Sequence, residues 1–100
     1  MLPTKVRQFL SNLRERTESG EFTWNYDDMQ STVHVQASEF QVTIRYRFNE
    51  IEEFGEFSIF YYELPHGSEL RFYTNEQYND YSLVRSLFDV AQASSMKFPF

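Results

Sequence analysis

The stretch "FQVTIRYRF", residues 40–48, decides the fold, because apolar and polar side chains alternate along it without interruption. Successive side chains of an extended strand point to opposite faces of a sheet, so a period of two gathers the apolar residues on one face. The alternation therefore predicts a β-strand that packs one face on a core and leaves the other face to solvent.

Similar runs lie on both sides of this stretch and are separated by short polar connections. We expect five strands, over residues 21–26, 33–37, 40–48, 57–64 and 69–73. The connections are "DDMQ" (27–30), Ser38 with Glu39, "NEIEEFGE" (49–56) and "PHGS" (65–68). Parallel pairing needs crossovers of about a dozen residues. The short connections therefore predict an antiparallel meander of four to five strands.

A helix is predicted at the start of the chain. Pro3 suits a first helical turn, and apolar residues then recur at spacings of three and four up to Leu13. Ser19 and Gly20 would end this helix after Glu18, because glycine readily takes the left-handed backbone conformation that terminates helices.

A second helix is predicted near the end of the chain from an apolar stripe over residues 83–91. Its start stays open between two alternatives. Asn79 or Asp80 would cap it directly, whereas Thr74 with Gln77 would form a capping box that adds a turn.

These elements predict one α+β domain over residues 1–100, in which an N-terminal helix, the meander sheet and a C-terminal helix follow one another. Two such helices are long enough to cover one face of the sheet and not both, so we expect both on the same face. The sheet residues expected beneath them are Phe22, Trp24, Tyr26, Val33, Val35, Phe40, Val42, Ile44, Tyr46, Phe57, Ile59, Tyr61, Leu70 and Phe72.

The opposite, helix-free face is expected to carry arginines and aromatics without any acid. Its members are Thr23, Asn25, Thr32, His34, Gln36, Gln41, Thr43, Arg45, Arg47, Ser58, Phe60, Tyr62, Arg71 and Tyr73. Mixtures of arginine and aromatic residues are typical of interfaces. The expected binding residues are Phe60, Tyr62, Tyr73, Arg45, Arg47, Arg71 and His34. The alternative is a solvated sheet surface, on which arginine stems cover the rings.

The charge of the chain is unevenly distributed. The net charge of −6 divides into +2 over residues 1–20, −7 over 21–63 and −1 over 64–100. A negative total disfavours general binding to nucleic acid, whose affinity comes largely from basic side chains. The absence of cysteine and of a long apolar run favours a cytoplasmic protein without a signal peptide or membrane partner.

Catalytic and metal-binding motifs are missing from the sequence. The two histidines, His34 and His66, fall on a predicted strand and in a turn, and there is no cysteine. The glutamates of the 49–56 connection lack the alternating ligands and central glycine of a calcium loop. We therefore expect neither an enzyme nor a bound metal or cofactor.

Three hypotheses of function remain. The first is a non-catalytic module, such as an adaptor, inhibitor or immunity-like factor, that binds another protein or a second copy of itself through the helix-free face. The second uses the same face for single-stranded nucleic acid, with rings stacking on bases and arginines meeting phosphates. The third is mimicry of nucleic acid by an acidic patch, which would block a basic partner. That patch would comprise Asp27, Asp28, Glu50, Glu52, Glu53 and Glu56.

Overall fold

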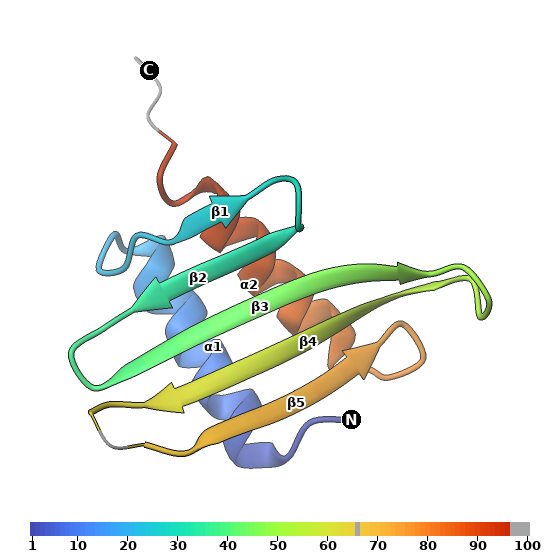
Figure 1. The fold of residues 1–100 in the computed structure, drawn as a ribbon, viewed down its shortest axis with the longest axis horizontal. Helices are drawn as coiled ribbons and strands as arrows, with labels where there is room; N and C mark the ends of the chain where they lie inside the picture. The colour runs from blue at the N-terminus through green and yellow to red at the C-terminus, as the bar shows by residue number, and fades with distance from the viewer. Residues whose placement is uncertain (66, 97–100) are drawn as a thin grey trace.

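The computed structural model describes residues 1–65 and 67–96, so His66 and the last four residues lie outside the described part of the chain. The elements follow the order α1 (Thr4–Glu18), β1 (Asn25–Asp27), β2 (Thr32–Gln36), β3 (Phe40–Asn49), β4 (Phe54–Glu63), β5 (Glu69–Asn75) and α2 (Tyr81–Ala93). The strands form one antiparallel sheet in the order β1-β2-β3-β4-β5 (Figure 1). The predicted α+β meander is confirmed, with five strands.

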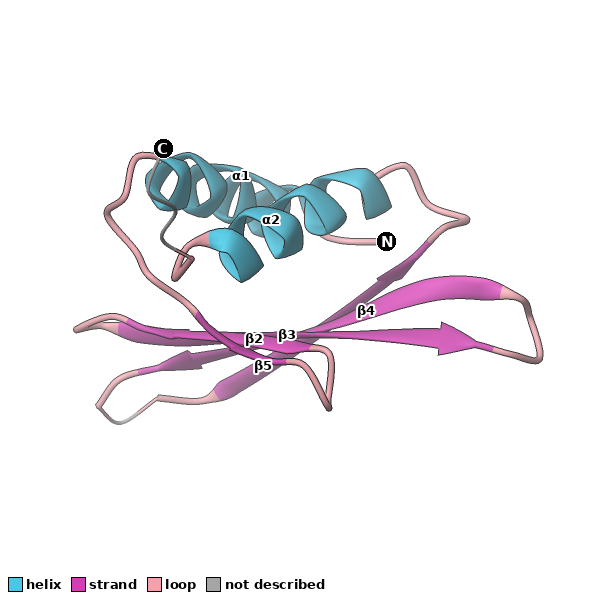
Figure 2. Ribbon diagram, turned by 90° about the horizontal axis from the view of Figure 1, so that it is seen from above, coloured by secondary structure: helices cyan, strands magenta, loops and turns pink. Residues whose placement is uncertain are grey.

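Both helices lie on the same face of the sheet, and the core fills the space between the two layers (Figure 2). The helices are linked to each other by Arg14, whose Nε donates a 2.6 Å hydrogen bond to Ser86 Oγ. Leu10 and Leu13 of α1 are buried in this core, and so are Val84 and Leu87 of α2. The apolar stripes of both helices are therefore buried against the sheet, as their spacing predicts. The other face of the sheet is open.

Neither helix of the described residues combines the length and apolar character needed to cross a bilayer.

The residues expected beneath the helices belong to the core, with one exception. Thirteen of the fourteen residues are buried or pack against the buried cluster. The ring of Phe57 lies at its centre, with ring centroids 5.4 Å from Phe88 and 5.2 Å from Tyr81. Leu70 is the exception, because it shares the helix-facing side of β5 but remains 50% exposed.

The first strand is shorter than its alternating pattern predicts. The expected run from Glu21 is wrong, and β1 begins only at Asn25. Trp24 leaves the ladder because its backbone N–H donates to Ser94 Oγ at 2.8 Å instead of to a neighbouring strand. Its indole Nε1 donates to Thr17 Oγ1 at 3.0 Å, which fixes the fully buried ring between α1 and the sheet.

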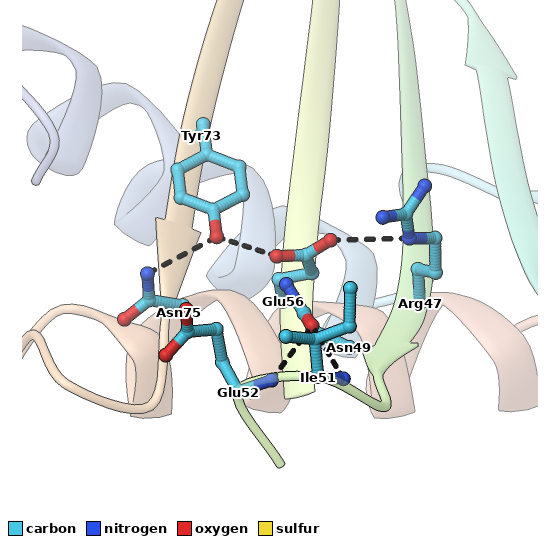
Figure 3. A network of polar contacts seen from close by, with 7 residues as sticks. All are labelled: Arg47, Asn49, Ile51, Glu52, Glu56, Tyr73 and Asn75. Carbon is cyan, nitrogen blue, oxygen red and sulfur yellow. Dashed lines mark hydrogen bonds and ion pairs between the residues drawn. The ribbon is translucent and has the colours of Figure 1, made fainter. Parts of the chain in front are cut away.

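The fourth strand is longer than predicted, and this changes the face on which one acid lies. β4 starts at Phe54 because the 49–56 connection is not a loop throughout. Asn49 closes a tight turn by accepting N–H bonds from Ile51 and Glu52 at 3.1 and 3.0 Å (Figure 3). Pairing resumes directly after this turn, so Glu56 is a strand residue opposite Arg47.

The start of α2 is decided by a contact distant in sequence. β5 extends to Asn75, so Thr74 is a strand residue and the capping box predicted for it is wrong. Asp80 occupies the N-cap position, yet its carboxylate does not cap the helix. It accepts hydrogen bonds from the Thr74 hydroxyl and, at 2.6 Å, from the backbone N–H of Leu2.

Candidate functional site

The open face is organised in rows that cross the central strands, because antiparallel pairing places side chains of equal parity side by side. One row runs His34, Thr43, Phe60, Arg71, and a second runs Thr32, Arg45, Ser58, Tyr73. A third row runs Gln36, Gln41, Tyr62, Glu69, and a fourth runs Arg47, Glu56, Asn75. All seven residues expected to bind lie on this face, spread over β2, β3, β4 and β5.

A shallow hollow of about 310 Å³ lies over the first and third of these rows and extends to Arg45 of the second. Its lining combines two aromatic rings with polar and charged side chains: Gln41, Thr43, Arg45, Phe60, Tyr62 and Glu69. Tyr62 is 38% exposed, whereas Phe60 is half-buried. Among the described residues Arg45 forms no ion pair. The hollow therefore offers an unpaired cation beside two rings.

The guanidinium group of Arg71 covers one of these rings. Its central carbon lies 5.6 Å from the centroid of Phe60, within the range of a cation–π contact. Its Nε also lies 2.7 Å from Glu69 Oε1. Arg71 is thus occupied within its own chain by a ring and a carboxylate.

A second cluster on the open face is centred on Glu56 (Figure 3). The Tyr73 hydroxyl donates to Glu56 Oε2 at 2.5 Å, and Arg47 Nε lies 3.2 Å from Glu56 Oε1. Asn75 donates to the Tyr73 hydroxyl oxygen at 3.1 Å. Partial burial and the hydrogen bond to Glu56 raise the pKa of Tyr73 above its ordinary value. The cluster holds the Tyr73 ring in place while leaving it 42% exposed.

The expectation of a face without acids is therefore wrong. Glu56 and Glu69 both lie on it, opposite Arg47 and Tyr62 respectively, and Asp27 lies there opposite Thr32. Glu56 belongs to β4, which starts at Phe54 and not at the predicted Phe57, so the sequence places it in the connection instead of on this face. Two of the three arginines of the face are paired with carboxylates, so its local charge is close to balanced.

His34 has a structural partner on the same face. Its Nδ1 lies 2.8 Å from the hydroxyl oxygen of Thr43, the residue directly opposite on β3. No group of three histidine, cysteine or acidic side chains able to hold a metal ion occurs within residues 1–65 and 67–96.

The acidic residues divide between two hairpin turns and the open face. Asp27 is the last residue of β1 and Asp28 begins the β1–β2 turn, whose Met29 N–H donates to Asp27 Oδ1 at 3.0 Å. Glu50, Glu52 and Glu53 belong to the β3–β4 turn and are exposed. Antiparallel topology places these two turns at the same end of the sheet (Figure 1). Glu56 is separate from them, because Arg47 and Tyr73 engage it on the open face.

Three features of the surface escaped the sequence reasoning. Met29 and Ile51 project from the two hairpin turns and are 96% and 92% exposed. An apolar groove of about 220 Å³ also opens between α1 and β5, with Leu70 on its wall. The remaining residues of the groove are Lys5, Val6, Phe9, Leu10, Val42, Ile59, Tyr61 and Phe72. No local feature of the sequence marks Leu70 as exposed, because apolar and polar residues alternate around it as in a strand with one buried face.

Comparison with known proteins adds no assignment to this site: protein-family models, curated proteins and solved structures each contain no match to the chain.

Proposed function

We propose that the chain is a non-catalytic module that binds another protein through its open sheet face. The observation that carries this proposal is the hollow in which Phe60 and Tyr62 lie beside Arg45, a cation without an ion-pair partner among the described residues. Tyrosine, phenylalanine and arginine are enriched in protein interfaces, and their anchors cluster in pockets that a partner can desolvate.

The contacts that hold two of the rings support the same proposal. Tyr73 is held by Glu56 and Asn75, and Phe60 is held by Arg71. A side chain that is already ordered loses less conformational entropy when a partner covers it. Binding of a partner to Tyr73 and Phe60 should therefore cost little conformational entropy.

The nucleic-acid hypothesis receives less support from the same geometry. Arg47 and Arg71 face Glu56 and Glu69 at 3.2 and 2.7 Å, so their charge is partly neutralised within the chain. Backbone phosphates would have to compete with these carboxylates, while electrostatic attraction supplies most of the affinity for nucleic acid. A protein partner with a mixed polar and apolar surface suits the face better.

The test is the double variant Phe60→Ser, Tyr62→Ser, with Phe48→Ser, Tyr78→Ser as its matched control. The control removes the same two residue types, which are 51% and 40% exposed, from positions outside the open face. Proteins captured from the native cell extract by the wild type should be lost with the first variant and retained with the second. Each captured protein is then purified, and its affinity is measured for the wild type, the open-face variant and the control variant.

Circular dichroism separates loss of binding from loss of folding. The open-face variant should keep its stability within about 1–2 kcal/mol, because neither ring belongs to the buried core. Capture that survives in this variant, or is lost equally in the control, contradicts the proposal. Captured nucleic acid in place of protein supports the alternative use of the same face.

A further inference from the structure

The outer edge of β5 combines three features that together suggest a partner. β5 is the last strand of the sheet and spans seven residues, Glu69–Asn75 (Figure 1). The apolar groove between α1 and β5 opens beside it, with Leu70 half exposed. Strand edges without a partner are usually short or blocked by proline, bulges or charged side chains; β5 contains no proline, and its two charged residues, Glu69 and Arg71, are of opposite sign.

The hydrogen-bonding direction of β5 follows from contacts just beyond its ends. Glu76 N–H donates to Gly55 O at 3.2 Å, and these two residues continue the β4–β5 register. Antiparallel strands alternate between residues that bond to one neighbour and residues that face away. The backbone groups of Phe72 and Thr74 therefore point to β4, and those of Glu69, Arg71 and Tyr73 point outward.

We propose that two copies of the chain pair β5 with β5 in antiparallel fashion, about a two-fold axis that passes at Leu70. In this register Glu69 lies directly opposite the partner's Arg71, and Arg71 lies opposite the partner's Glu69. All four residues present their outward backbone groups to each other, as a hydrogen-bonded pair requires. Leu70 meets the partner's Leu70 at the mouth of the two grooves.

Charge selects this register over its neighbours. An axis at Arg71 would set two arginines against each other, and an axis at Glu69 would set two glutamates against each other. An axis at Phe72 would oppose Arg71 to the partner's Tyr73 and pair no charges. Directly opposed unlike charges stabilise a strand pair, and like charges destabilise it. The strand is therefore self-complementary in one register, and Arg71 exchanges its own Glu69 for that of the partner.

The pairing would also extend the open face. A two-fold axis normal to the sheet leaves the open faces of both copies on the same side. The two sheets then join through the segments Glu69–Arg71, and residues 72–75 of each β5 lie beyond the paired segment. This proposal does not rest on the proposed function. Glu69 also lines the hollow, but the pairing uses the outward backbone groups and opposite charges of Glu69 and Arg71, whereas the proposed function rests on Phe60, Tyr62 and Arg45.

The test is sedimentation, which measures the mass of the protein in solution. It compares the wild type with Glu69→Arg, with Arg71→Glu and with the double reversal that combines both changes. The wild type should sediment at twice the 12.1 kDa of one chain. Each single reversal should sediment as one chain, because it opposes like charges twice. The double reversal should restore the dimer, and a 1:1 mixture of the two single variants should dimerise more tightly than either alone.

Matched controls separate this effect from a change in net charge. Glu52→Arg and Arg16→Glu alter the net charge by the same amounts at exposed sites away from β5, and both should remain dimeric. Phe60→Ser, Tyr62→Ser should also remain dimeric, which distinguishes this interface from the proposed one. A single-chain mass for the wild type up to about 1 mM, the weak end of specific association, overturns the proposal. A dimer that survives both reversals, or a double reversal that stays monomeric, overturns it as well.

Discussion

Replacement of Asp80 should destabilise the protein more than any other single change of an acidic residue. Its side chain is almost fully buried and joins three segments, namely the start of the chain, the end of β5 and the start of α2. The carboxylate accepts from Leu2 N–H at 2.6 Å and from the Thr74 hydroxyl, and thereby ties the start of the chain and the end of β5 to α2. Leu2 and Thr74 are themselves buried, so neither donor has access to water as a substitute.

The size of the effect follows from these two bonds. A hydrogen bond to a charged group contributes about 1.5–3 kcal/mol, and a buried donor left without a partner costs about 1–3 kcal/mol. Asp80→Ala leaves two such donors, so we expect a loss of about 2–5 kcal/mol in the free energy of unfolding. Asp80→Asn keeps one acceptor oxygen and should lose less. Chemical denaturation measures both variants against Asp89→Asn, a control at an exposed aspartate of α2.

The pH dependence provides a second, independent measurement. Burial raises the pKa of Asp80, but the hydrogen bonds from Thr74 and Leu2, together with the positive charges of the N-terminal amine and Arg7, outweigh it and lower the pKa below its ordinary value. A carboxyl with a lowered pKa in the folded state stabilises the fold above its unfolded pKa, near 4, and loses this contribution as the pH falls through the folded pKa. The stability gap between wild type and Asp80→Asn should therefore shrink below about pH 4. A constant gap, or an alanine variant as stable as the control, would refute this account of Asp80.

Three further predictions address the core, the sheet and metal binding. Leu87→Ala should cost about 2–5 kcal/mol in thermal unfolding, because the side chain is fully buried between α2 and the sheet; an unchanged melting temperature would show that α2 does not dock. Gly55→Ala should destabilise by about 1–3 kcal/mol, because its Cβ would come within 2.6 Å of Tyr81 Oη and 2.9 Å of the Tyr46 ring; the added change Tyr81→Phe should recover part of the loss, and no recovery would contradict the steric cause. Addition of a chelator should leave the melting temperature unchanged, and unfolding that a divalent ion reverses would contradict this.

Much of the fold could be predicted because its signals are local. The alternation over residues 40–48 and the apolar stripes of the two helices place each buried side chain on its face with no knowledge of the partners. Short connections then leave antiparallel pairing as the only compact arrangement. The same alternation predicts Phe60, Tyr62 and Tyr73 on the open face, where they lie in the structure.

The errors arose where a backbone or side-chain group finds a partner far along the chain. Trp24 has a strand-like pattern, yet Ser94, seventy residues later, takes its N–H. Asp80 is at a position typical of a helix cap, yet its carboxylate accepts hydrogen bonds from Leu2 and Thr74 instead. No local pattern contains such contacts, because they exist only once the helices and the sheet have packed.

The sequence by itself determined the layers, the order of the strands and the two faces of the sheet, since periodicity and connection length act within a few residues. Tertiary structure alone decided the electrostatic character of the open face. The extension of β4 to Phe54 brought Glu56 between Arg47 and Tyr73, and the packing of α1 left Leu70 uncovered at the β5 edge. Both outcomes depend on how far each strand pairs and how much of the sheet a helix covers, which is set by the packed chain as a whole.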